Sequence, residues 1–414
     1  MGHVDNLLTT SVHGVSIWSS KTIPIYKEVN IMTINQVYTI LNSVASQLWG
    51  SSAVAVTDTT GFYSLGQSVS GQTDNFLSAL VDRIGKTVVR TLDVSLDFPG
   101  IMRHEFEFGA MLQKVNVQPT AAQEAKWAEI GQPGFTPDQF KIDKPDVRVS
   151  YWKDSATFEF DMTIPDTLFK TAFESEAQMS AFISGIFKTL ETSMTMYINY
   201  LTRGVVNAMI AEKLDRSHYV DLLTDYNSGH TPTLTAAEAL ESADFLKWAG
   251  RVIRNYIKYL EEPSVLYNEG DLSGTAMIRS TSRDNMHVLM NTSFVSSYTT
   301  YYEADVFNRE LAEMPYFTEV KYWQGTGTTA PNDGDCMAIK VEIGNGNTVE
   351  EDYVIGVLAD REAIATGLYD RFSAADRNNR QRYTNYTEGA MLQHIIDLSE
   401  NVVVFTLGAP TITP

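Results

Sequence analysis

Three things are scarce in this sequence, and each absence excludes a class of protein. One cysteine, Cys336, stands among 414 residues, which excludes an intramolecular disulfide framework and a four-cysteine zinc site and fits an intracellular origin. Lysine and arginine total 31 against 51 aspartate and glutamate, and the net charge of −20 argues against a general nucleic-acid-binding protein. No apolar run approaches the roughly 18 residues of a membrane span, so no contact with a membrane is predicted.

A recognisable catalytic motif is also lacking. His104–Glu105 has no second histidine at the spacing of a zinc-protease helix, and Cys336 opens a strand-like run as a small hydrophobe rather than a nucleophile. The remaining histidines are isolated along the chain: His3, His13, His218, His230, His287 and His394. Because single histidines seldom form sites, the sequence predicts no catalytic, cofactor-binding or metal-binding residue.

Two glycine-rich segments, GTGTTA at 325–330 and GNGN at 344–347, are weak candidates for phosphate binding. Both lack the lysine and the following helix that a phosphate loop has, so both are expected to be turns. Two acidic pairs carry carboxylates of the kind used in acid–base catalysis: Asp352/Asp360 and Glu261/Glu262. Nothing in the sequence fixes the spacing within either pair, and solvated charge is the simpler interpretation.

A basic island interrupts the acidic chain in the segment RFSAADRNNRQRY, and its arginines are Arg371, Arg377, Arg380 and Arg382. One interpretation is contact with DNA or with an acidic partner surface. The other is a set of local salt bridges to Asp370 and Asp376. Both stay open at the level of sequence.

The strongest pattern is one long amphipathic helix. Ser175 lies three residues before Gln178, the spacing of a capping box at a helix start. The apolar residues that follow recur every three or four positions: Met179, Phe182, Ile183, Ile186, Phe187, Leu190, Met194, Tyr197, Ile198 and Leu201. Continued to Leu214, the helix has roughly 38 residues and a length on the order of 57 Å. A helix this long needs a broad sheet or another subunit to bury its stripe, and Ile186, Leu190 and Ile198 are expected to lie against a sheet.

Two β-patterned runs precede this helix, at 101–118 and 145–162. About 26 polar residues join them, which predicts a long hairpin with an elaborated tip. Neither run alternates strongly with a buried partner. A lone hairpin is marginal in water, so it is expected to lie on a neighbouring molecule.

The other expected elements alternate between helices and strands. Helices are expected over Thr33–Gly50, at the start of 75–98, from a capping box at Thr235 and Glu238 to a point before Pro263, and over Ser293–Glu313. Strands are expected at 286–291, 317–323, 336–343 and 352–359, at the end of 75–98, and in a last run that places Val402, Val404 and Thr406 on one face. Residues 51–73 are expected to be an extended arm and residues 215–234 a polar loop.

The order of these segments resembles the major capsid proteins of tailed phages, which have the Hong Kong phage capsid fold that encapsulins share. Within that family the chain is most similar to the short-tailed podophages of the phi-twenty-nine type. The similarity is carried by DNFLSALVDRIGKTVVR at 74–90, IPDTLFKTAFESEAQMSAFISGIF at 164–187 and NMHVLMN at 285–291, and extends over about 32–412. Some members carry an immunoglobulin-like domain after the capsid core, and surface attachment through such a domain is not implied here.

The resemblance implies an α+β fold with four parts. These are an N-terminal arm (1–73), an E-loop hairpin (101–160), a peripheral domain that contains the long spine helix (74–100, 161–225 and 376–414) and an α/β axial domain (226–375).

The implied function is that of a major capsid protein, not an enzyme. The chain would self-assemble into hexamers and pentamers of an icosahedral or prolate shell that encloses double-stranded phage DNA without sequence-specific binding. Scaffolding and portal proteins would be its partners, and the virion, assembled in the host cytoplasm, its location. The alternative is an encapsulin-type compartment that encloses enzyme cargo. The acidic balance agrees with a shell, because an acidic lining does not trap a polyanion through its phosphates.

One further expectation concerns covalent bonds between subunits. Lys126, Lys141 and Lys144 lie in the expected hairpin tip, but no Lys–Asn–Glu set is identifiable, so covalent locking between subunits is not expected.

The other expectation concerns the N-terminus. Codons for Lys27-Glu28-Val29 can spell a ribosome-binding sequence before Met32. Residues 1–31 are therefore either an untranslated leader read in frame or a genuine arm, and the two interpretations are equally supported.

Overall fold

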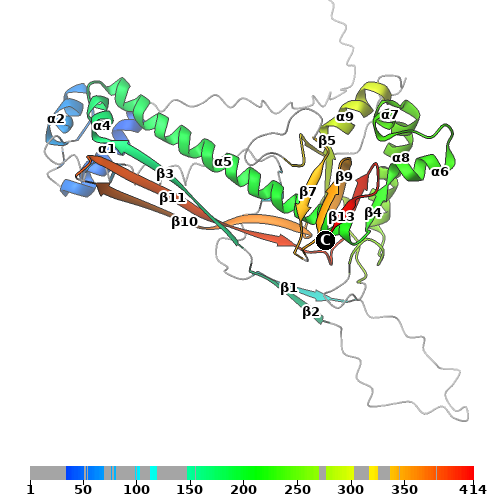
Figure 1. Cartoon of the computed structure of the whole chain (residues 1–414). Coiled ribbons are helices and arrows are strands. Elements are labelled where there is room, and N and C mark those ends of the chain that lie inside the picture. Colours follow the sequence, from blue (N-terminus) through cyan, green and yellow to red (C-terminus); the bar gives the residue numbers. More distant parts are fainter. Residues whose placement is uncertain are drawn as a thin grey trace, which may run out of the picture.

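The long helix and a twisted sheet beneath it form an elongated arm, and a mixed α/β body lies at the helix C-terminus (Figure 1). These are the features of a computed structural model. It describes residues 34–50, 53, 55–69, 76, 79–80, 98, 100–102, 112–118, 147–153, 155–269, 277–302, 317–324, 336–344, 346–378 and 380–414. Helices and strands both contribute substantially, which confirms the expected α+β class.

The predicted long helix is confirmed as α5, Glu176–Asp215, with 40 residues. Its first turn is capped as expected, because the Ser175 hydroxyl oxygen accepts a hydrogen bond from the backbone N–H of Gln178 at 3.2 Å. Lys213 lies in the last turn, where a cation suits the negative end of the helix dipole. The Ser175 cap therefore fixes the start of the helix, and Lys213 stabilises its C-terminal end.

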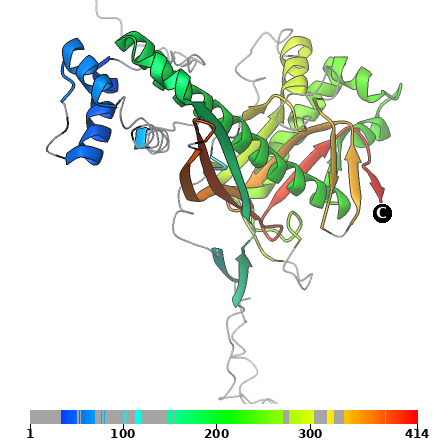
Figure 2. The same cartoon turned by 60° about the vertical axis from the view of Figure 1, so that its left-hand side comes forward.

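A three-stranded antiparallel sheet, in the order β10-β11-β3, lies along the first half of α5 (Figures 1 and 2). Its strands are β3 (Ser155–Pro165), β10 (Ile364–Asn378) and β11 (Tyr383–Ile396). The sequence analysis did not anticipate the β10–β11 hairpin. In its outer part β10 is exposed, so hydrophobic periodicity is weak there.

The stripe of α5 is buried against this sheet, as expected. Ile186 and Leu190 are 6% and 2% exposed and belong to an apolar cluster with Ile164 of β3 and Tyr386 of β11. Further along the helix, Ile198 is fully buried in a second cluster that contains Phe158, Leu368, Ala390 and Leu392. The helix is thus stabilised by side chains from strands that lie up to about two hundred residues away in sequence.

The body is built on a five-stranded mixed sheet in the order β4-β12-β9-β5-β6. Its strands are β4 (Tyr219–Asp221), β5 (Met286–Asn291), β6 (Thr318–Val320), β9 (Val354–Asp360) and β12 (Val402–Thr406). The second half of α5 packs on one face, where Val206, Met209 and Ile210 share a cluster with the sheet. A strand covered on both faces reads as a continuous apolar run, as β9 does.

The shared face expected for Val402 and Val404 is confirmed. Val403 and Phe405 are equally buried on the opposite face, so the strand is covered on both sides within the body.

Helices cover the opposite face of the sheet. They are α6 (Leu222–Gly229), α7 (Ala236–Glu241), α8 (Ala243–Glu261) and α9 (Thr292–Ser297), which continues into a π-helical turn, η4 (Tyr298–Tyr302); a short 3₁₀ turn, η3 (Arg283–Asn285), precedes β5. The predicted capping box is present at α7, where Thr235 and Glu238 satisfy each other's backbone N–H groups.

The single helix expected after Thr235 is two helices. Ser242 is extended, with φ −91° and ψ 113°, and its hydroxyl caps α8 by accepting from the N–H of Phe245. A serine can end one helix and start the next because its side chain replaces the missing backbone partner. The helix expected over Ser293–Glu313 is described only as far as Tyr302.

Two segments expected to be irregular contain regular structure. Within 51–73, α2 (Thr59–Val69) is a helix whose Phe62, Leu65 and Val69 are buried. Within 215–234, β4 pairs in parallel with β12, and the Asp221 carboxylate caps α6 through the N–H groups of Leu223 and Thr224. Polar composition concealed both elements, because each depends on tertiary contacts for its burial.

The remaining elements are short. Helix α1 (Ile34–Trp49) confirms the amphipathic helix expected there, and α4 (Asp166–Ala172) connects β3 to α5. A third sheet in the order β13-β8-β7 flanks the body, with strands β7 (Ile339–Glu342), β8 (Thr348–Glu351) and β13 (Thr411–Thr413). The helix-to-strand transition expected within 75–98 lies largely outside the described residues, as do residues 1–31.

The expected hairpin is present where the structure describes both of its strands. Strands β1 (Leu112–Val117) and β2 (Val147–Trp152) pair antiparallel, and the hairpin projects below the rest of the molecule (Figure 1). The second β-patterned run is not one strand. It divides near Lys153, and its later half, β3, pairs with β11 instead of with the first run.

Candidate assembly surface

The two faces of the β1–β2 hairpin have opposite character. Register pairs Val115 with Val149 and Val117 with Val147, and paired residues of an antiparallel ladder share a face. All of the large apolar residues on this face are exposed: Val115 54%, Val117 57%, Val147 49%, Val149 42% and Tyr151 59%. Valine and tyrosine favour strands, and none of the four apolar clusters in the described residues covers this face.

The opposite face carries Lys114, Asn116, Arg148 and Ser150 beside Trp152, and it is the one that packs on the chain's own body. Asn116 is 5% exposed, and the Lys114 side chain is 17% exposed. A hairpin normally buries its apolar face and exposes its polar face. This hairpin does the reverse, which is the arrangement expected of an element whose apolar face is covered by another molecule.

Lys114 lies among three carboxylates from the body. Its Nζ is 2.6 Å from Glu400 Oε1, 3.0 Å from Asp397 Oδ2 and 3.1 Å from Glu362 Oε2. Burial lowers the pKa of Lys114, but Asp397 and Glu400 outweigh it and the pKa is raised above its usual value. Lys114 is therefore held as a cation at neutral pH.

Glu400, a second enclosed partner in this ion cluster, also contacts Arg279. Burial raises its pKa, while Lys114 and Arg279, whose Nη2 lies 3.1 Å from Glu400 Oε1, act to lower it. Asp397 is further tied by hydrogen bonds from the N–H and hydroxyl of Ser399. The carboxylates are thus fixed in position by their own loop before Lys114 reaches them.

Other contacts between the hairpin and the body are also polar. Trp152 Nε1 donates to the carbonyl of Ile396 at 3.2 Å, and Gln393 Nε2 donates to the carbonyl of Trp152 at 3.4 Å. The backbone N–H of Ile278 donates to Gln118 Oε1 at 3.2 Å. Among the described residues, none of the four buried apolar clusters includes a residue of β1 or β2.

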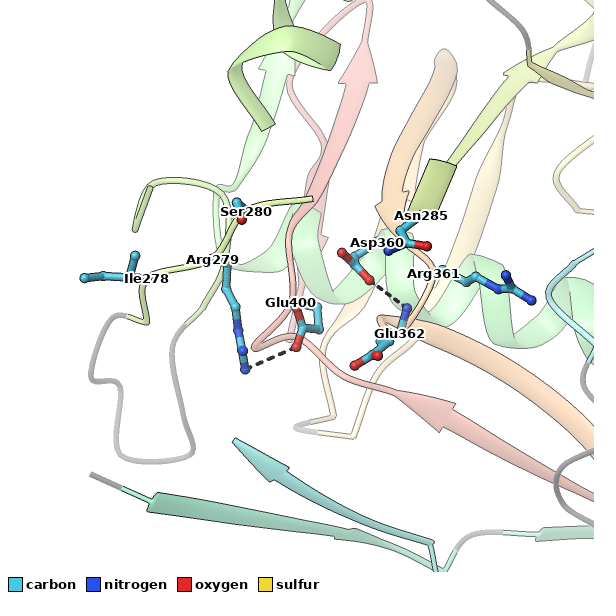
Figure 3. A pocket seen from close by; sticks show the side chains of 8 residues that line it. All are labelled: Ile278, Arg279, Ser280, Asn285, Asp360, Arg361, Glu362 and Glu400. Atoms are coloured by element: carbon cyan, nitrogen blue, oxygen red, sulfur yellow. Dashed lines mark hydrogen bonds and ion pairs between the residues drawn. The ribbon is translucent and has the colours of Figure 1, made fainter. Parts of the chain in front are cut away.

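A polar cleft of about 600 Å³ opens beside the ion cluster (Figure 3). Its lining residues are Ile278, Arg279, Ser280, Asn285, Asp360, Arg361, Glu362 and Glu400. Figure 3 shows Arg279 directed at Glu400, and the N–H of Glu362 directed at Asp360. Solvent therefore has access to one side of the cluster.

The acidic pairs considered from sequence are structural or solvated. Asp360 is 8% exposed and accepts hydrogen bonds from the Thr281 hydroxyl at 2.6 Å and from the Glu362 N–H at 2.8 Å. Its expected partner Asp352 is exposed, and so are both members of the Glu261/Glu262 pair. Neither pair forms an acid–base site.

The histidines that the structure describes are not brought together with one another or with the cysteine. His230 stacks on Tyr226 at 3.9 Å, His218 pairs with Glu269, and His287 approaches Gly100. Cys336 is half-buried. In the part of the chain described above, no three His, Cys, Asp or Glu side chains are grouped to hold a metal ion.

The basic island occupies the β10–β11 hairpin. Arg380 and Arg382 are exposed at its turn, and Arg382 has a positive φ of 57°. Asp370 and Asp376 are also exposed.

Three of the candidates considered from sequence lie outside the described residues: GTGTTA, His104–Glu105 and the three tip lysines. No helix in the described ranges is both long and apolar enough to cross a membrane.

Sequence reasoning located the hairpin but missed what anchors it. The alternation of valines in KVNVQ and DVRVSYW is visible in the sequence, and it marks one apolar face. Lys114, Asp397 and Glu400 gave no signal, because the lysine and the acids are separated by more than 280 residues.

An outward apolar hairpin on an elongated α+β subunit defines a protein built to associate with its neighbours. The comparisons with known proteins identify which kind. Residues 39–406 match the sequence profile of the Phi29-like phage major capsid protein family, and the chain belongs to that family. This is the family that the sequence predicted.

Individual relatives are distant. The chain is 20% identical to the major capsid protein of Bacillus phage PZA over 346 residues, which are 82% of this chain and 65% of that protein. A chain in the capsid structure of Staphylococcus phage Andhra matches with a TM-score of 0.48 and 12% identity, covering 76% of this chain and 86% of that one. A chain in the structure of head fiber and inner core protein gp22 of native bacteriophage P68 matches with a TM-score of 0.48 and 11% identity, covering 76% and 85%.

Proposed function

We propose that the chain is the shell-forming subunit of a phage head and that copies associate through the apolar face of the β1–β2 hairpin. The observation that carries this proposal is the reversed hairpin, with valines outward and Lys114 and Asn116 inward. Fully burying one valine side chain is worth about 1.5–3 kcal/mol. Four valines and one tyrosine, each about half exposed in the subunit, together supply a favourable contribution to each contact between copies, before the cost of association is subtracted.

A second copy of the same chain is the partner best suited to this face. The subunit belongs to a capsid protein family, and a closed shell repeats one contact many times. Within this proposal the hairpin acts as the E-loop, α5 as the spine helix and the five-stranded sheet as the centre of the axial domain. Hexamers and pentamers are the expected assembly units, with scaffolding and portal proteins as accessory partners.

Enclosed double-stranded DNA is the proposed content of the shell. The net charge of −20 favours a lining that does not hold the duplex by its phosphates, so packaging and release are not opposed by tight contact. The exposed Arg380 and Arg382 at the β10–β11 turn are the exception to this balance. An enzyme-loaded compartment of the encapsulin type is distinguished by the absence of nucleic acid in particles purified from infected cells.

The direct test places charge on the apolar face. Val115→Asp combined with Val149→Asp puts two carboxylates opposite each other where a neighbour is expected to pack. The variant is expected to fold, since both positions are exposed, and to form no shells in electron micrographs. Ile412→Asp, which changes a 39% exposed residue on β13, is the matched control and is expected to assemble.

Removal of residues 120–143, which lie in the connection between β1 and β2, is a second test of the same proposal. The shortened chain is expected to remain a folded subunit and to close no shells. Normal assembly by either variant contradicts the role of the hairpin.

A further inference from the structure

The hairpin is attached to its own subunit in an unusual way. Elements of the body are held by apolar clusters, whereas the described contacts of β1 and β2 with the body are hydrogen bonds and ion pairs. Polar contacts lose much of their strength to competition from water, unless they are shielded. The angle of the hairpin is therefore set by whichever of these contacts is most protected.

The most protected contact is the Lys114 cluster. The exposed fractions of the Asp397 and Glu400 side chains are 5% and 7%, against 17% for Lys114 itself. An ordinary surface pair of the same kind, Lys340 with Glu350, has exposed fractions of 64% and 48%. Exposed pairs contribute little, and partly buried pairs are screened far less by salt.

The position of the cluster matters as much as its burial. Glu362 lies between β9 and β10, while Asp397 and Glu400 lie between β11 and β12. These two loops lead directly between the three-stranded sheet under α5 and the five-stranded sheet of the body. Lys114 therefore ties the hairpin to a junction of the two sheets.

We propose that Lys114, Asp397 and Glu400 form an electrostatic clamp that fixes the angle of the β1–β2 hairpin on its own subunit. Lys114 is a positioning residue: it points the apolar face toward the neighbouring copy before the two meet. The clamp rests on the proposed function of that face. The clamp lowers the conformational-entropy cost of association, because a hairpin already held in one orientation loses less freedom on binding.

Solvent access gives the clamp a way to open. The cleft beside Glu400 and Glu362 brings water and ions to one side of the cluster, and 63% of the Glu362 side chain is exposed. High salt is therefore expected to weaken the clamp without unfolding the apolar clusters.

The test measures the angle of the hairpin directly. In a Cys336→Ser background, cysteines introduced at Tyr151 on β2 and at Glu241 on α7 carry spin labels, and double electron–electron resonance gives the distance between them. Val149→Asp is included in every labelled protein to remove the apolar contact between copies. The starting protein is expected to show one narrow distance distribution, which broadens as sodium chloride is raised.

Three substitutions of lysine separate the clamp from a general loss of charge. Lys114→Met is expected to broaden the distribution at low salt, while Lys114→Arg keeps it narrow. Lys340→Met, which removes the exposed pair, also keeps it narrow. Thermal unfolding of the Lys114→Met protein is expected to stay close to that of the starting protein, because the apolar clusters are intact.

The two proposals fail separately. A narrow distribution in the Lys114→Met protein overturns the clamp, whatever the assembly result. Shell formation by the Val149→Asp protein counts against the proposed function, whatever the distance result. With an intact apolar face, the Lys114→Met chain is expected to assemble several-fold more slowly than the Lys114→Arg chain, and equal rates would also overturn the clamp.

Discussion

At the scale of single residues, buried ionisable groups are the positions where sequence says least. Lys213 is fully buried in the last turn of α5 and is paired with Glu269 at 2.9 Å, and burial lowers its pKa. Glu351 is also buried, and burial raises its pKa most, with Asp352 and Asp221 adding to the rise and the N–H of Tyr353 acting against it. A charged side chain is buried only where the surrounding fold compensates or tolerates it, and composition does not reveal which.

Glu351 gives a prediction about pH. Because its folded-state pKa lies above the usual 4.5, the folded protein binds the proton more tightly than the unfolded chain does. The contribution of Glu351 to the free energy of unfolding is therefore fully present at low pH, and it is lost as pH rises through the folded-state pKa. Glu351→Gln is expected to melt progressively higher than the wild type as pH rises from about 4 to 8. Calorimetry across that range measures the difference, and a constant offset would contradict the prediction.

Gly250 gives a prediction in which packing opposes helix propensity. The residue lies in the middle of α8, where alanine is normally about 1 kcal/mol more favourable than glycine. A Cβ at this position would lie 2.7 Å from Cε2 of Tyr298, which is 1% exposed. Gly250→Ala is expected to destabilise the protein by about 1–3 kcal/mol, as over-packing does. Urea unfolding measures the sign, and stabilisation would show that Tyr298 moves freely.

At the scale of elements, α5 has a different role in each half. Its first half lies on a sheet and is exposed on its outer face, while most of residues 202–214 are buried. The helix therefore belongs to both the elongated arm and the body, and it links the position of the arm to that of the body. Its stability depends on the apolar stripe and not on its caps alone.

Ile186→Asp tests this dependence. The side chain is 6% exposed among apolar residues of α1, β3 and β11, so an aspartate there is an unpaired buried charge. A loss of about 3–5 kcal/mol and a largely insoluble protein are expected. Met196→Asp, at a 44% exposed position on the same helix, is the matched control and is expected to cost under about 1 kcal/mol. Soluble, assembling Ile186→Asp protein would rule out the packing described for α5.

At the scale of the whole molecule, exposed apolar side chains lie on more than one surface of the elongated subunit. The reversed hairpin is one such surface, and Met196 and Tyr200 on the outer face of α5 are also exposed. Many modest interfaces, summed over a closed shell, are sufficient to hold it together without covalent bonds.

Covalent locking is therefore not expected in mature particles. Lys126, Lys141 and Lys144 supply amines in the connection between β1 and β2, but no Lys–Asn–Glu set is identifiable in the sequence. Boiled particles are expected to give a single monomer band on a denaturing gel. A ladder of multimers that survives boiling would reverse this expectation.

The sequence by itself determined the elements whose signals are local. The Ser175 cap and the three- and four-residue spacing fixed α5, and Thr235 with Glu238 fixed the start of α7, because each signal acts within one or two helical turns. The resemblance in segment order also sufficed to predict the family that residues 39–406 confirm.

Only the tertiary structure decided which strands pair and which way the hairpin faces. β3 could continue the hairpin by its pattern, yet it pairs with β11, more than 200 residues later. The valines of β1 and β2 mark one apolar face in either orientation, and only the folded chain shows that they face outward while Lys114 reaches Asp397 and Glu400. Strand pairing and ion clusters join residues that are distant in sequence, so no local pattern encodes them and only the folded chain brings them together.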